Sequence, residues 1–361
     1  MRIYLDHNAT SPLRPEAKAA MLAAMDQGGN ASSVHAEGRA ARKLVDDSRD
    51  SVASALGVIA PMVIFTSGGS EANNTAIGGV DVERILVSGI EHPSVIEAAK
   101  VSHLPLELIP VDADGIVELD ALAEMLDGPK ALVSVMLANN ETGVIQPVRD
   151  VVALAQKHGA LVHTDAVQAL GKIPVNFGLL GVDLMTVAAH KLGGPTGAGA
   201  LIVRDGLPVK PLLVGGGQER RRRAGTENLA AIAGFAAVAA EKPIQVKDLR
   251  DRLESELEDT VIFAKTAERL PNTTCFAVPG MNAETLLMAF DLDGIAVSSG
   301  SACSSGKVAR SHVLGAMGVP PEVSLAAIRV SLGWNTTETE IDTFLAAWHR
   351  IRARHKARVA A

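Results

Sequence analysis

The segment that decides the fold runs from Ala131 to Asp165 and reads ALVSVMLANNETGVIQPVRDVVALAQKHGALVHTD. Its two ends, ALVSVML and ALVHTD, are short apolar runs, which are typical of strands buried on both faces of a sheet. Between them, VRDVVALAQKHG (148–159) has the amphipathic pattern of a helix. A strand, a helix and a second strand in this order predict two parallel strands joined by a crossover helix.

The same alternation continues on both sides of this segment. Further runs predict strands: MVIFTS (62–67), RILVSG (84–89), LELIPV (106–111), DLMTVAAH (183–190) and GALIVR (199–204). Helices are predicted at SEANNTAIGGV (70–80), PSVIEAAKVS (93–102) and ELDALAEMLD (118–127). The sequence therefore predicts an α/β protein with a mostly parallel seven-stranded sheet that helices cover on both faces. In such sheets, ligands bind beyond the carboxyl ends of the strands.

The pattern changes after a long helix that follows Thr226 and a charged helix near residue 250. Beyond that point CFAVP, ETLLMAF, IAVSSGSACSS and IRVSLGW alternate with helical stretches, which predicts a smaller α+β domain. KPIQ (242–245) interrupts the helical pattern and marks the boundary. We expect a large domain over 16–245 and a small domain formed by 1–15 and 246–361, with the N-terminus packed against the small domain.

The composition narrows the class of protein. The chain has 361 residues, of which 47% are hydrophobic, and a formal net charge of −7. This charge predicts no nucleic-acid or anionic-membrane partner. Two cysteines form no disulfide framework and no zinc spacing, so we expect a reducing compartment and no metal. The N-terminus lacks a signal-peptide core and no apolar run is long enough to span a membrane, which predicts a cytoplasmic protein.

Three segments after predicted strands together indicate a pyridoxal 5'-phosphate (PLP) site. TSGGSEAN (66–73) starts a helix after a Gly pair, a geometry that suits a phosphate, although such a turn is more often only a turn. Asp165 ends one strand, and His190 and Lys191 end another. Alone, the Asp could be a helix cap and the His-Lys pair a surface feature. Together they supply a Schiff-base lysine and a carboxylate for the protonated pyridine nitrogen.

Other polar residues at strand ends have two interpretations each. His92 is either a helix-start residue or an imidazole stacked on the cofactor, and Asn140 is either a turn residue or a ligand of the ring hydroxyl. Arg329 lies inside an apolar strand and needs an anionic partner, which is either a substrate carboxylate or an internal Asp or Glu. The sequence leaves these pairs of alternatives open.

Two further segments stand out by composition. GGGQERRRRAGTEN (215–228) carries four consecutive arginines, which indicate a solvated face, a polyanion patch, or a phosphate site with Thr226 across a dimer interface. SSGSACSSG (298–306) places Cys303 among small polar residues, whereas Cys275 lies in the apolar run TTCFAV. The first setting is that of a reactive thiol and the second that of an inert core thiol.

In order along the chain, the motifs resemble those of the cysteine desulfurases. The resemblance rests on YLDHNATSP, SSVHAEGR, FTSGGSEANN, EHPSV, NNETGVIQP, HTDAVQALGK, AAHKLGGPTGAGAL, GGGQERRRRAGTEN, VSSGSACSS and IRVSLGW. These enzymes use PLP, have the aspartate-aminotransferase fold (fold type I) and belong to aminotransferase class V. The SSGSACSS loop and the following SHVL resemble group I, the branch of iron–sulfur cluster-assembly and nitrogen-fixation desulfurases.

The resemblance implies roles for the residues that match the family motifs. Lys191 matches the Schiff-base lysine, Asp165 the partner of the pyridine nitrogen, and Gln168 the residue near the ring hydroxyl. His92 matches the stacking histidine and Asn140 an asparagine close to cofactor and substrate.

Further matches concern the phosphate, the substrate and the sulfur. The Gly69–Ser70 helix start, His190 and, from a second subunit, Thr226 match phosphate ligands. Arg329 matches the arginine that binds the substrate carboxylate, and Cys303 matches the nucleophile that takes up the sulfur.

The implied function is conversion of L-cysteine to L-alanine by a homodimer, with the sulfur passed as a persulfide on Cys303 to an acceptor protein. The acceptor would use it for iron–sulfur cluster or thio-cofactor synthesis. The chain departs from the family at Ala188, where a phosphate-binding Ser is usual, and in GGPTG (193–197), which lacks the bulky and basic side chains of the usual motif. Alternatives are another class V PLP enzyme, such as a selenocysteine lyase or aminotransferase, or a weakly active paralogue acting as a partner protein.

Overall fold

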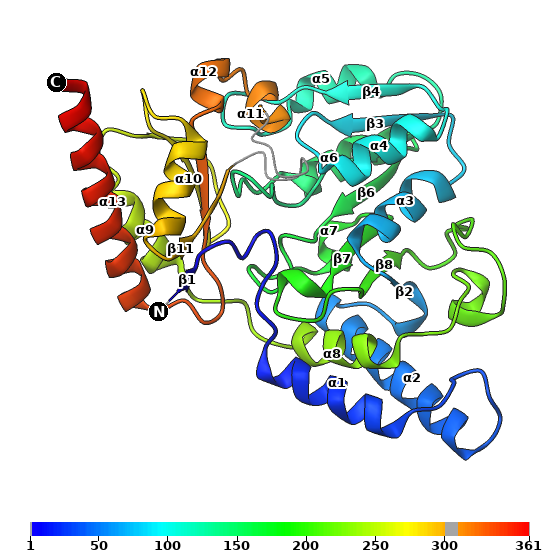
Figure 1. The fold of residues 1–361 in the computed structure, drawn as a ribbon. Coiled ribbons are helices and arrows are strands. Elements are labelled where there is room, and N and C mark those ends of the chain that lie inside the picture. The colour runs from blue at the N-terminus through cyan, green and yellow to red at the C-terminus, as the bar shows by residue number, and fades with distance from the viewer. Residues whose placement is uncertain (1, 300–309, 361) are drawn as a thin grey trace.

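The computed structural model describes residues 2–299 and 310–360. The strands of its main sheet are β2 (Val63–Thr66), β3 (Arg84–Ser88), β4 (Leu106–Ile109), β5 (Ala131–Ser134), β6 (Leu161–Asp165), β7 (Leu184–Ala188) and β8 (Gly199–Val203). They lie in the order β2-β8-β7-β6-β5-β3-β4 (Figure 1). Neighbours from β7 to β4 pair in parallel, whereas β8 is antiparallel to β7 and to β2. The predicted mostly parallel seven-stranded sheet is confirmed.

Helices cover both faces of this sheet, because successive strand residues point to opposite sides. In β3, Ile85 and Val87 pack into one apolar core and Leu86 into the other. The first core includes α3 (Gly69–Gly79) and α4 (Pro93–Val101). The second core is covered by α1 (Pro15–Gln27), α2 (Ala36–Leu56), α5 (Leu119–Met125), α6 (Val148–Lys157), α7 (Phe177–Leu180) and α8 (Leu229–Ala239).

The crossover helix α6 shows why these sequences form helices. Its buried residues Val148, Val151, Val152 and Ala155 recur at the spacing of one helical face. That apolar stripe packs on the sheet, and the polar residues of α6 face away from it. The strand–helix–strand unit predicted for 131–165 is thus present.

The remaining elements form a second body beside the sheet, except that α11 (His312–Ala316) packs its buried residues into the core of the main sheet (Figure 1). The elements of the second body are β1 (Ile3–Tyr4), α9 (Lys247–Ser255), β9 (Val261–Ile262), β10 (Thr273–Ala277), α10 (Ala283–Leu292), β11 (Ile295–Ala296), β12 (Ser298–Ser299), α12 (Pro321–Ser324), β13 (Ala327–Ser331) and α13 (Glu338–Ala360). An antiparallel sheet has the order β12-β13-β10-β9, and β1 pairs with β11. Phe276, Phe290, Phe344 and Trp348 fill its core. The domain limits 16–245 and 246–361 stay a prediction.

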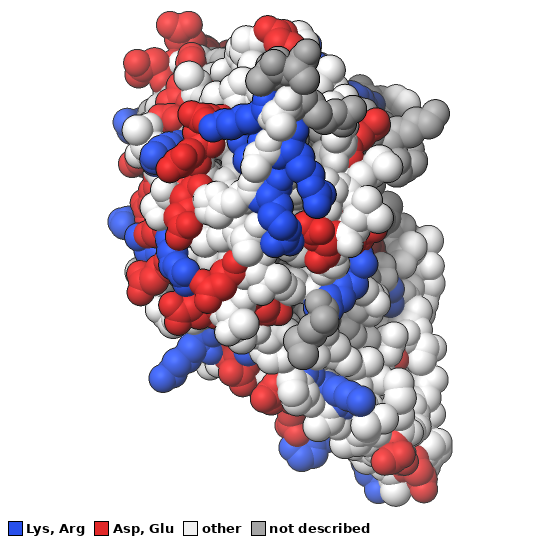
Figure 2. Space-filling model, turned by 60° about the vertical axis from the view of Figure 1, so that its left-hand side comes forward, with Lys and Arg blue, Asp and Glu red and all other residues white. Residues whose placement is uncertain are grey.

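Short 3₁₀ turns complete the described elements: η1 (Ala60–Met62), η2 (Ala189–Lys191) and η3 (Gln218–Arg221). Among the described helices, none is both long and apolar enough to cross a membrane. On the face that carries α13, basic and acidic side chains are interspersed (Figure 2). Several of them pair, as Arg350 does with Asp293 and Lys356 with Asp259. Exposed pairs of this kind stabilise little, so the apolar core holds this body together.

Candidate active site

A pocket of about 330 Å³ lies where β6 and β7 end and where α3 and α4 begin. Since the carboxyl ends of parallel strands meet at one edge of a sheet, residues from distant motifs converge there. The predicted residues that line it are Gly69, Ser70, His92, Asn140, Asp165, Gln168, His190, Lys191 and Arg329. Thr226 is exposed and is not among the lining residues, so a phosphate role for it requires a second copy of the chain. Cys303 lies outside the described residues.

Asp165 is held at the end of β6 as a buried carboxylate. Its Oδ1 accepts a hydrogen bond from the backbone N–H of Val167 (2.9 Å), and its Oδ2 accepts one from Asn73 Nδ2 (2.8 Å). The side chain of Asn73 also donates to Ser94 Oγ at 2.9 Å. Asn73 on α3 therefore fixes the carboxylate in place and links it to the start of α4.

His92 is the residue that begins α4. Its Nδ1 accepts a hydrogen bond from the backbone N–H of Ser94 (3.1 Å), and Pro93 occupies the first helical position. Burial lowers the pKa of His92, and Lys191 and His312 lower it further, although Asp165 opposes them. The ring is therefore neutral at pH 7, with its proton on Nε2 because Nδ1 is the acceptor.

Lys191 lies in η2, directly after β7. Its Nζ donates to the backbone carbonyl oxygens of Asn8 (2.6 Å) and Ala9 (2.8 Å). The N-terminal segment thus closes one side of the pocket, which explains why YLDHNATSP belongs to the site. Next to Lys191, the pKa of His190 is lowered to about 4 by burial and by the charges of Lys191 and Lys172.

The start of α3 forms the end of the pocket that suits a phosphate. The helix begins at Gly69, so its first backbone N–H groups lack helical partners and carry the positive end of the helix dipole. Ala188 borders this turn, since a Cβ built on Gly69 would lie 3.7 Å from the Ala188 Cβ. The usual Ser hydroxyl is therefore missing beside the phosphate end, as the sequence indicates.

Arg329 on β13 supplies the wall opposite the sheet. Its guanidinium donates to Asp6 Oδ1 (2.7 Å) and to the backbone oxygen of Asn140 (3.0 Å), and the residue is only 3% exposed. The internal carboxylate that the sequence left open is therefore present. Within the described part of the chain, however, Arg329 Nε and Asn140 Oδ1 are buried without a hydrogen-bond partner.

The sequence analysis missed two buried residues, Asn8, which lines the pocket, and Lys172, which bonds to it from outside the lining. Asn8 Oδ1 accepts from Lys172 Nζ (2.7 Å), and Asn8 Nδ2 donates to Thr273 Oγ1 (2.9 Å). Lys172 Nζ also donates to Gln168 Oε1 at 2.6 Å. The four-residue spacing of Gln168 and Lys172 in HTDAVQALGK was the available signal, because such residues share one face of a helical turn.

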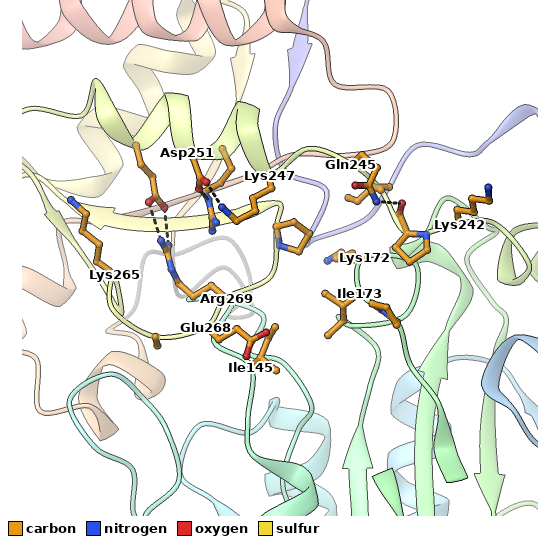
Figure 3. A pocket seen from close by; sticks show the side chains of 17 residues that line it. Ile145, Lys172, Ile173, Lys242, Gln245, Lys247, Asp251, Lys265, Glu268 and Arg269 are labelled. Carbon is orange, nitrogen blue, oxygen red and sulfur yellow. Dashed lines mark hydrogen bonds and ion pairs between the residues drawn. The ribbon is translucent and has the colours of Figure 1, made fainter. Parts of the chain in front are cut away.

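A larger cleft of about 810 Å³ lies on another side of Lys172 (Figure 3). Its charged side chains largely pair with one another, as Arg269 does with Glu254 at 2.7 Å and Lys247 with Asp251. Among the described residues, none lines both this cleft and the pocket. The cleft is therefore separate from the candidate active site.

Comparisons with known proteins agree on one family. Residues 3–344 match the family model of aminotransferase class V. The chain is 40% identical to the cysteine desulfurase IscS of Dictyoglomus turgidum, over 97% of this chain and 94% of that protein. The solved NifS-like protein of Rickettsia africae has a TM-score of 0.90 and 37% identity, covering 98% of this chain and 100% of that one. The structure of SspA in complex with cysteine has a TM-score of 0.84 and 26% identity, covering 93% and 100%.

Fold and site together define a PLP enzyme of fold type I. Within that class, the chain belongs to the aminotransferase class V family, in its cysteine desulfurase branch.

The residues present fit PLP. A lysine amine, a buried carboxylate and a helix N-terminus border one pocket, which matches the aldehyde, the pyridine nitrogen and the phosphate of the cofactor. Asn73 Oδ1, Asn140 Oδ1 and Arg329 Nε, which lack a hydrogen-bond partner among the described residues, belong to residues that line the pocket. Because buried polar atoms are normally hydrogen-bonded, they indicate that a polar molecule completes the site.

Proposed function

We propose that this protein is an L-cysteine desulfurase of group I, working as a cytoplasmic homodimer that supplies sulfur for iron–sulfur cluster or thio-cofactor synthesis. The observation that carries this proposal is the pocket in which Asp165 and Lys191, from the ends of β6 and β7, meet Arg329 from β13. The sequence similarity to an enzyme named as a cysteine desulfurase extends over almost the whole chain.

The cofactor would be held by residues from the sheet edge. Lys191 would bind it covalently, and Asp165 would pair with its protonated pyridine nitrogen. The N–H groups at Gly69 and Ser70, with His190, bind the phosphate, and Thr226 of a second copy completes it. When bound, PLP supplies an electron sink for bond changes on the substrate carbons.

The substrate carboxylate would bind to Arg329. A guanidinium has five N–H donors, and Asp6 and the Asn140 carbonyl leave the Nε donor unused. An amino-acid carboxylate entering the pocket can take this donor and compete with Asp6 for the rest. The side chain of Asn140, with its unpartnered Oδ1, orients the same end of the substrate.

Proton transfer would fall to Lys191 and His92. The lowered pKa of His92 keeps its ring neutral, and because Nδ1 already accepts the Ser94 N–H, the imidazole would take part through its Nε2–H. Lys191 is close to the substrate carbon by virtue of its covalent role and moves the Cα proton.

Sulfur transfer then balances without any external oxidant. The Cys303 thiolate attacks the substrate sulfur, so that an S–S bond forms and the Cβ–S bond breaks. The two electrons of the broken bond stay with the carbon skeleton, which takes up a proton and leaves as L-alanine. Cys303 retains the sulfur as a persulfide, and an acceptor protein removes it by thiol exchange.

The experiment compares the two cysteines. Cys303→Ala is expected to lose sulfide and alanine production from L-cysteine in the presence of a thiol, while it keeps the absorbance of the lysine-bound cofactor. Cys275→Ala is the matched control, because Cys275 is fully buried and burial raises the pKa of its thiol. Undiminished alanine formation by Cys303→Ala would contradict the persulfide route.

A further inference from the structure

Lys172 is a buried lysine beside the active site, and the sequence motifs assign it no role. It is 4% exposed, and among the described residues no ion pair includes it. Burial lowers the pKa of its amine well below the ordinary value, and the charges of Lys191 and Arg329 add to that effect. Since burying a lysine without a carboxylate costs stability, its retention calls for a specific task.

The contacts of its amine show what that task is. Lys172 Nζ lies 2.6 Å from Gln168 Oε1 and 2.7 Å from Asn8 Oδ1. The ammonium form has three N–H donors and the neutral amine has two, so either form can donate both hydrogen bonds. The amide atom of Gln168 that faces Lys172 is the oxygen, because the other amide atom lies 3.0 Å from the Asn8 backbone carbonyl, which can only accept.

The other end of the Gln168 amide is fixed as a consequence. With Oε1 turned to Lys172, Nε2 faces the pocket and the Asn8 backbone carbonyl, to which it donates at 3.0 Å. An amide nitrogen carries two hydrogens. Among the described residues, the Asn8 carbonyl is the one acceptor that Nε2 contacts. The second hydrogen is left for a group inside the pocket that Gln168 lines.

We propose that Lys172 is a positioning residue, which locks the Gln168 amide so that its N–H donates to the ring oxygen of the bound cofactor. This inference rests on the proposed function, because the family resemblance behind that function matches Gln168 to the residue near the ring hydroxyl of the cofactor. Lys172 itself touches neither cofactor nor substrate, since it is not among the residues that line the pocket. It acts through Gln168 and Asn8.

The larger cleft explains how the lysine reaches this position. Lys172 and Ile173 form part of its wall (Figure 3), while the Lys172 amine bonds to two residues that line the pocket. Lys172 thus lies between the two cavities, and its amine is bonded to residues of the pocket.

The test is the pH titration of the cofactor's visible absorbance in the purified, PLP-loaded enzyme. A donor to the ring oxygen stabilises the deprotonated form of the lysine-bound cofactor, which has more negative charge on that oxygen. Lys172→Met keeps the stem and removes the donors. We expect its titration midpoint to rise by about 0.5–1 pH unit, the equivalent of one hydrogen bond.

A double-mutant cycle separates positioning from a merely structural or electrostatic role. Gln168→Leu removes the residue through which Lys172 acts, so adding Lys172→Met to it is expected to leave the midpoint unchanged. An equal shift in both backgrounds, or no shift in the wild-type background, would overturn the proposal. Should Lys172→Met fail to fold, Lys172→Gln, which loses the reach of the amine, is titrated in the same two backgrounds.

The readout is independent of turnover. An enzyme that makes no alanine from cysteine but shows the expected shift would refute the desulfurase function and leave the role of Lys172 standing. Normal alanine formation by the wild type, together with an unchanged titration midpoint in Lys172→Met, would support the desulfurase function and refute the role of Lys172.

Discussion

Two arginines are almost equally buried in this protein, and they are used in opposite ways. Arg49 on α2 donates to both carboxylate oxygens of Glu219, at 2.6 and 2.8 Å, and to the Val63 carbonyl. Arg329 on β13 has one bond to Asp6 and one to a backbone oxygen, and its buried Nε lacks a partner within the described residues. No buried nitrogen of the first guanidinium lacks a partner among the described residues, whereas the second has a donor to spare.

The difference separates a structural arginine from a binding one. The carboxylate of Glu219 also accepts from the backbone N–H of Phe65 (3.0 Å), so the pair ties the arginine-rich segment to the sheet. Asp6, in contrast, is partly exposed at 19% of its side chain and lies beside an open pocket. A buried donor without a partner lowers the stability of the fold. Such a donor is therefore expected where a bound ligand supplies the missing hydrogen bond.

The largest expected effect is on the structural pair. Glu219→Gln leaves Arg49 as an uncompensated buried charge, so the free energy of unfolding is expected to fall by about 3–5 kcal/mol. Urea unfolding followed by circular dichroism measures this. Asp47→Asn, which breaks the exposed pair with Lys43, is the control and is expected to cost less than about 1 kcal/mol. Equal losses in both variants would remove the distinction between the two arginines.

The next effect is on the binding arginine. Arg329→Met is expected to lower kcat/KM for L-cysteine about 10- to 100-fold, the range for hydrogen bonds to a charged group, chiefly through KM. Its free energy of unfolding is expected to fall less than that of Glu219→Gln. Steady-state alanine formation and urea unfolding measure the two quantities.

Asp6→Asn is the matched control for Arg329→Met. It keeps the arginine and removes the competing carboxylate, so KM for L-cysteine is expected to stay level or fall. A strong loss of stability in Arg329→Met with an unchanged KM would make Arg329 structural, like Arg49.

The two arginines also show which parts of the site can be predicted from the sequence alone. Asp165 and Lys191 could be predicted because each follows an apolar run that is itself a local signal for a strand. The partner of Arg329 could not, since Asp6 lies at the opposite end of the chain and only the fold brings the two together. The sequence left substrate and internal carboxylate open, and the structure supplies the internal one.

The helices that were missed have a similar explanation. The sequence analysis assigned no helix before residue 62, although α1 and α2 precede it. In α1 only Ala17 and Ala24 are buried, so the helix carries almost no amphipathic pattern. Asn8 was missed for a related reason, because its role depends on contacts with residues such as Thr273 that are remote in sequence.

The smallest expected effect is a gain in PLP affinity at the phosphate end of the pocket. It tests whether the cofactor site, like Arg329, has room for one more hydrogen bond. Ala188 lines the pocket, is 1% exposed, and borders Gly69, so a hydroxyl there would face the phosphate. Ala188→Ser is expected to tighten PLP binding by up to about tenfold, the worth of one neutral hydrogen bond, in a titration of the apoprotein. Ala189→Ser adds the same hydroxyl to a buried neighbour that does not line the pocket and is expected to give no gain. If both variants bind PLP equally, or if Ala188→Ser binds it more weakly, the phosphate end has no unmet need for a donor. In that case the buried polar atoms that lack a partner in this pocket would bind only the substrate. The difference between Arg329 and Arg49 would then reflect substrate binding and not cofactor binding.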